Sequence, residues 1–89
     1  MSTAKQRFTA ADLIRGQNYI VKTSFEDYDG AIHHIGEQWR FIEKDFLPYD
    51  DGLSLFVEMN EQKVQIRLQW RDETQGKIIN NFSNYVQET

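Results

Sequence analysis

The segment VQIRLQWR at residues 64–71 decides the fold that the sequence predicts. Its apolar side chains alternate without exception with polar ones, which is the period-2 pattern of a β-strand buried on one face. The buried face is predicted to hold Val64, Ile66, Leu68 and Trp70. The opposite face then presents a row of amide and guanidinium groups to solvent.

Four earlier segments show weaker versions of the same alternation and predict four further strands. They cover residues 19–25, 32–35, 39–44 and 53–59. Gly30, Gly36 and the pair Asp51-Gly52 mark turns between these segments. Five strands joined by short turns favour a small antiparallel barrel, SH3-like or OB-like, or a curled meander. The predicted fold class is therefore mostly β.

Helical signals flank the strands at both ends. Thr9 is a candidate N-cap with Asp12 three residues later, which predicts a short N-terminal helical turn. Near the C-terminus, the apolar residues change to a helical period and predict a helix capped by Asp72. Its apolar stripe would consist of Ile78, Ile79, Phe82, Tyr85 and Val86. We expect this helix to cover one end or face of the sheet.

The length and composition limit the chain to a small set of protein classes. With 89 residues and no cysteine, residues 1–89 are expected to form a single domain with one core and no disulfide. Residues 1–7 lack the apolar run of a signal peptide and are predicted to be a disordered tail. No stretch is long and apolar enough to span a membrane. With no cysteine to indicate a compartment, the cytoplasm is the default. A net charge of −4 argues against nucleic-acid binding by bulk electrostatics.

The sequence carries no signature of catalysis, and neither a metal nor another cofactor is predicted. His33 and His34 point to opposite faces of a strand, so they cannot share one ion, although one of them could join Glu37 or Asp29. The segment at residues 27–30 resembles the start of a calcium loop but lacks the later ligands, so a turn is the preferred interpretation. We expect a protein that is not an enzyme.

An acidic loop with aromatic residues is the first candidate for a binding site. Exposed aromatic anchors ringed by charges are typical of protein interfaces. The predicted partner-binding residues are Asp45, Phe46, Tyr49, Asp50 and Asp51. The alternative is a solvated loop in which Phe46 and Tyr49 plug the core from above. The leading hypothesis is a small protein-interaction or accessory domain with an unknown protein partner.

The polar row of the best strand is the second candidate. Arg67 and Arg71, with Phe56 on the neighbouring strand, have the combination of charge and stacking that small barrels use for single-stranded nucleic acid. Two arginines make a weak positive surface, and the row could instead lie under the C-terminal helix or form cross-strand salt bridges. A third hypothesis is self-association through an exposed strand edge, so the chain is expected to be a monomer or a weak homodimer.

Three stretches resemble a small bacterial family of uncharacterised domains. They are GEQWRF at residues 36–41, FLPYDDGLSLFV at residues 46–57 and IRLQW at residues 66–70. The resemblance extends from about Gly16 to the C-terminus. It implies a compact bacterial domain and transfers no catalytic residue to this sequence.

Overall fold

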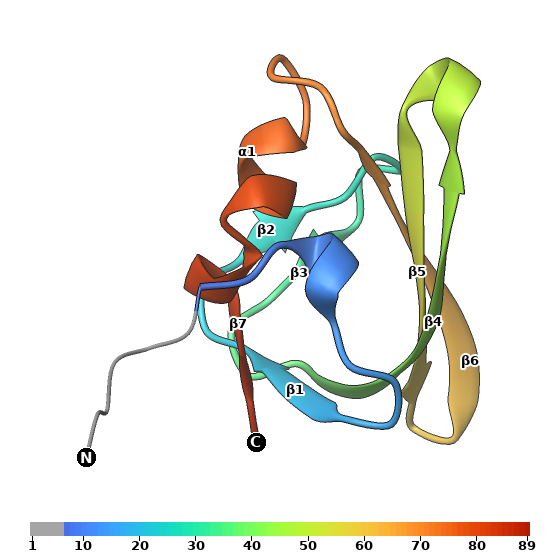
Figure 1. Ribbon diagram of the computed structural model, residues 1–89. Coiled ribbons are helices and arrows are strands. Elements are labelled where there is room, and N and C mark those ends of the chain that lie inside the picture. Colours follow the sequence, from blue (N-terminus) through green and yellow to red (C-terminus); the bar gives the residue numbers. More distant parts are fainter. Residues whose placement is uncertain (1–6) are drawn as a thin grey trace.

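A computed structural model describes residues 7–89, in which a five-stranded antiparallel sheet lies beside a two-stranded one (Figure 1). The main sheet has the order β6-β5-β4-β1-β7. Its strands are β1 (Asn18–Val21), β4 (Gln38–Leu47), β5 (Gly52–Met59), β6 (Gln62–Gln69) and β7 (Val86–Glu88). The small sheet pairs β2 (Phe25–Glu26) with β3 (Ile32–His33). Except for the exposed Arg7, the predicted disordered tail at residues 1–7 lies outside the described residues.

The helical segments are short. They are η1 (Ala10–Asp12), η2 (Pro48–Asp50), η3 (Phe82–Asn84) and the α-helix α1 (Gly76–Asn80). The predicted N-terminal cap is confirmed, because the Ala11 amide donates to Thr9 Oγ1 at 3.1 Å and the Thr9 amide donates to Asp12 Oδ2 at 2.9 Å. No helix within residues 7–89 is long and apolar enough to cross a membrane.

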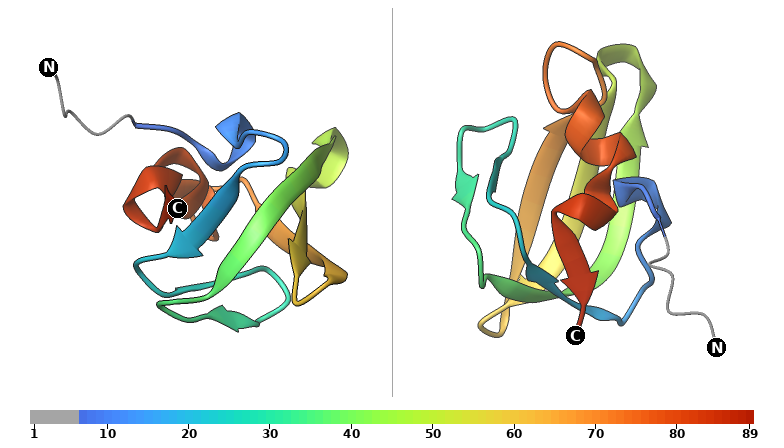
Figure 2. Two further views of the ribbon diagram at one scale, coloured as in Figure 1. Left: turned by 90° about the horizontal axis from the view of Figure 1, so that it is seen from below. Right: turned by 90° about the vertical axis from the view of Figure 1, so that its left-hand side faces the viewer.

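The main sheet is open, with β6 and β7 as its two edges. The predicted fold class, mostly β with a C-terminal helix, is confirmed, but the described residues do not close into a barrel, and neither the SH3-like nor the OB-like type is confirmed. The physical reason lies in the predicted strand at residues 19–25, which is interrupted after Val21. Its second half, β2, leaves the main sheet to pair with β3. The meander of the predicted alternative describes β4, β5 and β6, which are consecutive neighbours in the sheet (Figure 2).

The C-terminal segment differs from the single long helix that the sequence predicts. The α-helix begins after Gln75, not at Asp72, and ends at Asn80. After η3, the amides of Lys22 and Thr23 donate to the Tyr85 carbonyl, and the chain continues as β7 alongside β1. The predicted apolar stripe nevertheless marks the buried side, because Ile79, Phe82 and Val86 are fully buried. Burial was therefore predicted correctly where the secondary structure was wrong.

The core lies between the concave face of the sheet and the C-terminal helical segments. Its largest members include Tyr19, Trp39 and Phe82. Trp39 is buried as its alternation predicts, whereas Trp70 is only half-buried. The Trp70 indole N–H donates to Asn80 Oδ1 at 2.9 Å, and its ring meets Phe46 edge-to-face. Trp70 thus joins the core to the end of the β4–β5 hairpin.

A β-bulge in β4 decides which side chains of the hairpin face inward. Phe41 lies opposite Val57 and Glu43 lies opposite Phe56, so Ile42 has no counterpart on β5. The simple alternation predicted Glu43 on the face of Phe41, and the bulge moves it to the opposite face. All side chains from the bulge to the hairpin end lie on the face opposite to the one that simple alternation predicts.

Candidate functional site

The β4–β5 hairpin ends in an exposed apolar cluster, which we call the tip patch and define as Phe46, Leu47 and Tyr49. The hairpin end extends beyond the helical segments at one end of the molecule (Figure 1). Tyr49 is 89% exposed, and Phe46 and Leu47 are 45% and 42% exposed. Large apolar side chains that cluster at the surface mark interaction sites more often than single exposed ones do. The tip patch is therefore the first surface to consider for binding.

Local sequence chemistry shapes the turn that presents Tyr49. Pro48 occupies the first position of η2, where its missing N–H leaves no hydrogen bond unmade. Asp51 adopts the left-handed conformation with φ of 55°, and the Gly52 amide donates to Asp50 Oδ1 at 3.1 Å. Asp and Asn are the residues that tolerate this conformation best after Gly. The turn is thus specified by its own sequence.

The chain that follows β6 braces the tip. Arg71 Nε donates to Asp51 Oδ2 at 2.9 Å, and the Trp70 amide donates to the Asp51 carbonyl at 2.8 Å. The hydrogen bond to Asp51 raises the pKa of Arg71, which therefore stays charged. The Phe46 and Trp70 rings meet edge-to-face with centroids 6.1 Å apart. These contacts fix the direction in which the hairpin projects.

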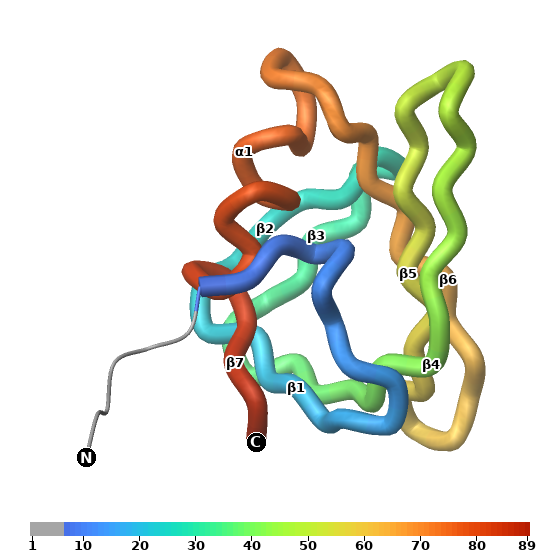
Figure 3. Tube along the Cα trace, viewed as in Figure 1, coloured from blue at the N-terminus to red at the C-terminus, as the bar shows by residue number. Residues whose placement is uncertain are grey.

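Carboxylates lie around the tip patch, and only Asp51 among those of the hairpin end has a described cation as its partner. In the part of the chain that the structure describes, Asp45 and Asp50 form no ion pair, and Arg71 is paired with Asp51. Asp72 and Glu73 follow Arg71 in the loop at the same end of the molecule (Figure 3). Negative charge is consequently concentrated around the exposed apolar side chains.

The structure brings the five predicted partner-binding residues to one hairpin end but distributes them over both faces. Asp45 lies opposite Ser54 on the outer, solvent-facing side, whereas Phe46 lies opposite the buried Leu53 on the inner side. Tyr49 points into solvent. It therefore does not plug the core, contrary to the alternative interpretation. Asp51 is engaged by Arg71. The accessible members of the set are therefore Asp45, Phe46, Tyr49 and Asp50.

The arginines of the predicted nucleic-acid face are already partnered. Arg67 contacts Asp29 at 3.2 Å and lies 5.8 Å from the centre of the Tyr28 ring. The other predicted arginine, Arg71, binds Asp51 as described above. Phe56 is half-buried, with the Lys63 ammonium 5.1 Å from its ring centre. Arg67 and Arg71 are exposed and not covered by α1, and each is paired with a carboxylate. The carboxylates lie in turns, so these pairs are not the cross-strand salt bridges of the second alternative.

A buried cluster centred on His33 has a chemistry that sequence reasoning detected only in part. The His33 ring contacts Glu37 Oε2 through Nδ1 at 2.7 Å and Asp27 Oδ2 through Nε2 at 2.8 Å. Phe25 stacks on the ring with a centroid distance of 4.8 Å. From the sequence, Glu37 was considered only as a companion of a histidine at a metal ion, and the pairing with Asp27 was not predicted.

This cluster holds the β2–β3 hairpin and does not form a metal centre. Asp27 Oδ1 also accepts the amides of Asp29 and Ala31 at 3.0 Å each, which confirms the turn interpretation of this segment. Between Arg7 and Thr89, no group of three His, Asp or Glu side chains is placed to bind a metal ion. His33 is buried and His34 is exposed, so no substrate reaches the paired imidazole directly.

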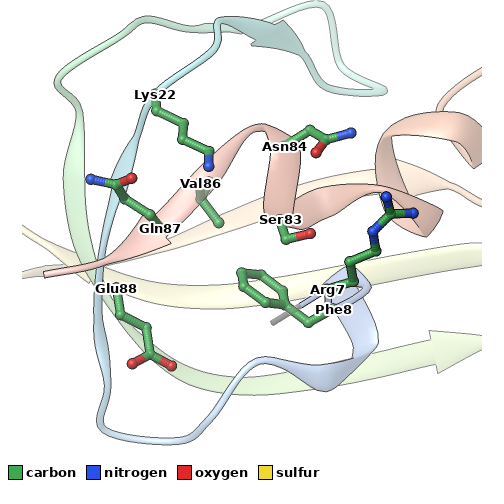
Figure 4. Close-up of a pocket in the computed structure, with 8 residues that line it drawn as sticks. All are labelled: Arg7, Phe8, Lys22, Ser83, Asn84, Val86, Gln87 and Glu88. Atoms are coloured by element: carbon green, nitrogen blue, oxygen red, sulfur yellow. The ribbon is translucent and has the colours of Figure 1, made fainter. Parts of the chain in front are cut away.

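A groove beside β7 has a volume of about 590 Å³ (Figure 4). Its lining residues come from both ends of the chain and from the bend after β1. They are Arg7, Phe8, Lys22, Ser83, Asn84, Val86, Gln87 and Glu88. Sequence reasoning missed this groove, because the alternation that identifies strands gives no information on which distant segments will lie side by side.

The fold and its surfaces define a small open-sheet β domain with an exposed hairpin end and a buried histidine cluster. Residues 3–88 match the family described as Domain of unknown function (DUF3601), and the chain belongs to this family. It is similar to an integron cassette protein from the mobile metagenome of Vibrio cholerae, VCH_CASS4. The two are 37% identical, with a TM-score of 0.85 over 88% of this chain and 87% of that one.

These comparisons confirm the uncharacterised bacterial family that the sequence predicted. No curated protein matches the chain. Neither the description of the family nor the name of the cassette protein assigns a specific function. The functional conclusion therefore depends on the surfaces described above.

Proposed function

We propose that this domain is a non-catalytic protein-interaction module of the cytoplasm that binds its partner through the tip patch. The exposure of Tyr49 at 89% beside Phe46 and Leu47 carries the proposal. Aromatic side chains supply a large share of binding energy when a partner covers them. The braced hairpin lowers the entropy that binding would otherwise lose, because the patch is held in one orientation before contact.

The charges around the tip patch indicate the chemistry of the partner. Asp45 and Asp50 present carboxylates that no described cation neutralises, and Asp72 and Glu73 add negative charge at the same end. Complementary potentials favour a partner with lysine or arginine side chains around an apolar group. Association should weaken as the salt concentration rises, because the attraction acts between solvent-exposed charges.

Affinity capture from host lysate tests this proposal. Tagged wild-type protein and the Tyr49→Ala variant are compared with and without nuclease, and retained proteins are identified by mass spectrometry. Tyr49→Ala should reduce capture of the partner at least about tenfold, the effect of an interface anchor. Ile35→Ala is the matched control, because Ile35 is a large apolar side chain that is 68% exposed outside the tip.

Each outcome of the capture experiment separates the two binding hypotheses. A nuclease-resistant partner that Tyr49→Ala loses and Ile35→Ala retains supports the tip patch. A partner that both variants retain equally contradicts it. Material that disappears with nuclease would instead favour the alternative face, with Phe56, Arg67 and Arg71 in contact with single-stranded nucleic acid.

A further inference from the structure

The outer edge of β7 has backbone hydrogen-bonding groups that have no partner within residues 7–89. The Lys22 amide donates to the Tyr85 carbonyl at 2.7 Å, and the Thr89 amide donates to the Asn18 carbonyl at 3.0 Å. Antiparallel pairs alternate between hydrogen-bonded and non-hydrogen-bonded, so Gln87 bonds to Ile20 while its two neighbours do not bond to β1. The N–H and C=O groups of Val86 and Glu88 therefore point away from the sheet, toward the groove.

Among residues 7–89, no backbone group pairs with this edge. Phe8 lies beside η3, because its carbonyl accepts the Ser83 amide at 3.1 Å, and it lines the groove together with Val86 and Glu88 of β7. The space of about 590 Å³ is wide enough for an extended segment of a few residues. Unpaired strand edges of this kind are templates for another strand.

The groove carries opposite charges at its two ends. Arg7 and Lys22 line it with Val86, and neither cation has a carboxylate partner among the described residues. Glu88 lies at the other end of the same strand and is likewise without a described ion pair (Figure 4). The edge therefore has a cationic half and an anionic half.

We propose that a second copy of this chain docks on this edge by pairing its β7 antiparallel with the first β7. A two-fold axis at Gln87 places Val86 of each copy opposite Glu88 of the other. Each of these two pairs exchanges two backbone hydrogen bonds. The same symmetry brings Glu88 of one copy to the side of the groove that Arg7 lines in the other. An interface of this type is self-complementary, as two-fold symmetry requires.

This interface is independent of the tip patch and leaves it free. The tip patch and the C-terminal end of β7 lie at opposite ends of the molecule (Figure 3). The dimer would therefore present two tip patches directed away from each other. A bivalent module of this kind binds a partner that carries repeated sites more tightly than one copy does.

The short strand sets the expected strength of the association. β7 has 3 residues, so the paired surface is smaller than that of stable interfaces. A weak dimer with a Kd in the range of about 10 μM to 1 mM is expected. Sedimentation velocity of the full chain over protein concentrations of about 10 μM to 1 mM covers this range. The mean molar mass should rise toward that of two chains.

Two kinds of variant test whether β7 is the surface. Glu88→Pro removes an outward N–H and leaves the bonds between β1 and β7 intact, so it should weaken the dimer at least about tenfold. Glu88→Lys and Arg7→Glu should each weaken it, because like charges then face each other, and the double variant should recover the dimer. Glu61→Lys makes the same change of charge in the exposed turn between β5 and β6 and serves as the control.

Four outcomes would overturn the proposal. They are a molar mass of one chain at all concentrations, a dimer that survives Glu88→Pro, a double variant that does not recover, and a loss of the dimer in Glu61→Lys equal to that in Glu88→Lys. A monomer that binds an acidic extended peptide in the groove would also contradict self-association and identify the groove as a peptide site instead.

Discussion

The two edges of the main sheet are covered to different extents. On β6, the Arg67 carbonyl accepts the Tyr28 amide at 2.7 Å, and the Gln69 amide donates to Gln75 Oε1 at 2.9 Å. The Gln69 carbonyl in turn accepts the Thr74 hydroxyl at 3.1 Å. On β7, the corresponding groups of residues 86 and 88 remain open within the described chain. Loops therefore cover the C-terminal part of the β6 edge, whereas the outward backbone groups of Lys63 and Gln65 and those of β7 have no partner within the described chain.

This difference shows that a small sheet can protect part of an edge without adding a strand. Two loops cover this part of β6: the turn at residues 27–31, which the His33 cluster holds, and the connection from β6 to α1, which closes at Gly76. Variants that disturb these loops should destabilise the fold. Variants at the outward groups of β7 should change association and leave the fold intact.

The largest effect is expected for Asp27→Ala. This variant leaves the buried His33 ring without one of its two carboxylates and removes the acceptor of two turn amides. Each buried polar group left without its hydrogen-bond partner costs about 1–3 kcal/mol in the free energy of unfolding, and this variant leaves more than one. Urea denaturation measures this loss. Asp29→Ala, which breaks only the exposed pair with Arg67, should cost less than about 1 kcal/mol; equal losses in both variants would contradict a stabilising cluster.

Gly76→Ala should have the next largest effect. It should destabilise the protein, whereas helix propensity alone predicts that alanine stabilises it. Alanine is the better helix former by about 1 kcal/mol. A Cβ at this position, however, would lie 2.6 Å from the Arg71 carbonyl oxygen, which is backbone that cannot move aside freely. Overpacking of this kind costs about 1–3 kcal/mol, measurable as a lower thermal midpoint. Lys77→Ala changes the next, exposed residue and should leave the midpoint nearly unchanged; a stabilised Gly76→Ala would show that the loop relaxes.

A smaller, pH-dependent effect is expected at the N-terminal cap, which follows the groove residue Phe8. The amide and hydroxyl of Thr9 donate to Asp12 and hold the pKa of its carboxyl below the ordinary value. A carboxyl whose pKa is lowered by folding stabilises the protein above its unfolded pKa of about 4, and this contribution is lost as the pH falls through the folded pKa. Asp12→Ala should lower stability at neutral pH by less than about 1 kcal/mol, since the group is exposed.

Denaturation at several pH values measures this contribution. Wild type and Asp12→Ala should converge in acid, and a difference between them that is constant with pH would exclude the carboxylate as its source. Asp45→Ala, at another exposed acid without a described partner, is the control.

The smallest effect on the fold is expected for Glu88→Pro at protein concentrations at which the chain is monomeric. The Glu88 N–H of the wild type points away from β1, so its loss should change the free energy of unfolding by less than about 0.5 kcal/mol. Gln87→Pro removes a hydrogen bond of the β1 ladder and should cost about 1–3 kcal/mol. The difference in stability between these two variants tests whether adjacent amides of β7 point alternately toward β1 and away from it. Equal losses of stability would mean that the two amides face the same way.

The sequence predicted the elements whose pattern is local. β5 and β6 follow their alternation, and the cap at Thr9 follows from its neighbours. β7 was missed because Val86 continues an apolar stripe of helical period, and burial on one side looks the same in both structures. Barrel closure failed as a prediction because the break after β1 depends on a contact between Lys22 and Tyr85, far apart in the chain.

The candidate sites show the same limit. The composition of residues 45–51 identified the hairpin end, but both a plugged core and an exposed anchor fitted that composition, and only the fold separates them. The hydrogen-bonded pairing of His33 with Asp27 and Glu37 was not predicted, because the sequence pattern was considered only for metal ligands. The β7 groove was not predicted at all, because its two walls come from opposite ends of the chain.

The bulge at Ile42 gives β4 a position at which the length of the strand can change. Ile42 is the residue without a counterpart on β5, so its deletion would leave Phe41 opposite Val57 directly before Glu43 opposite Phe56, which is regular pairing. Phe41 and Phe46 would both keep their inward faces. A single-residue insertion between the bulge and the tip, by contrast, would need a second bulge or would turn the side chains on one side of it to the opposite face. Related domains that keep this surface should therefore vary in the length of β4 at the bulge rather than by insertions closer to the tip.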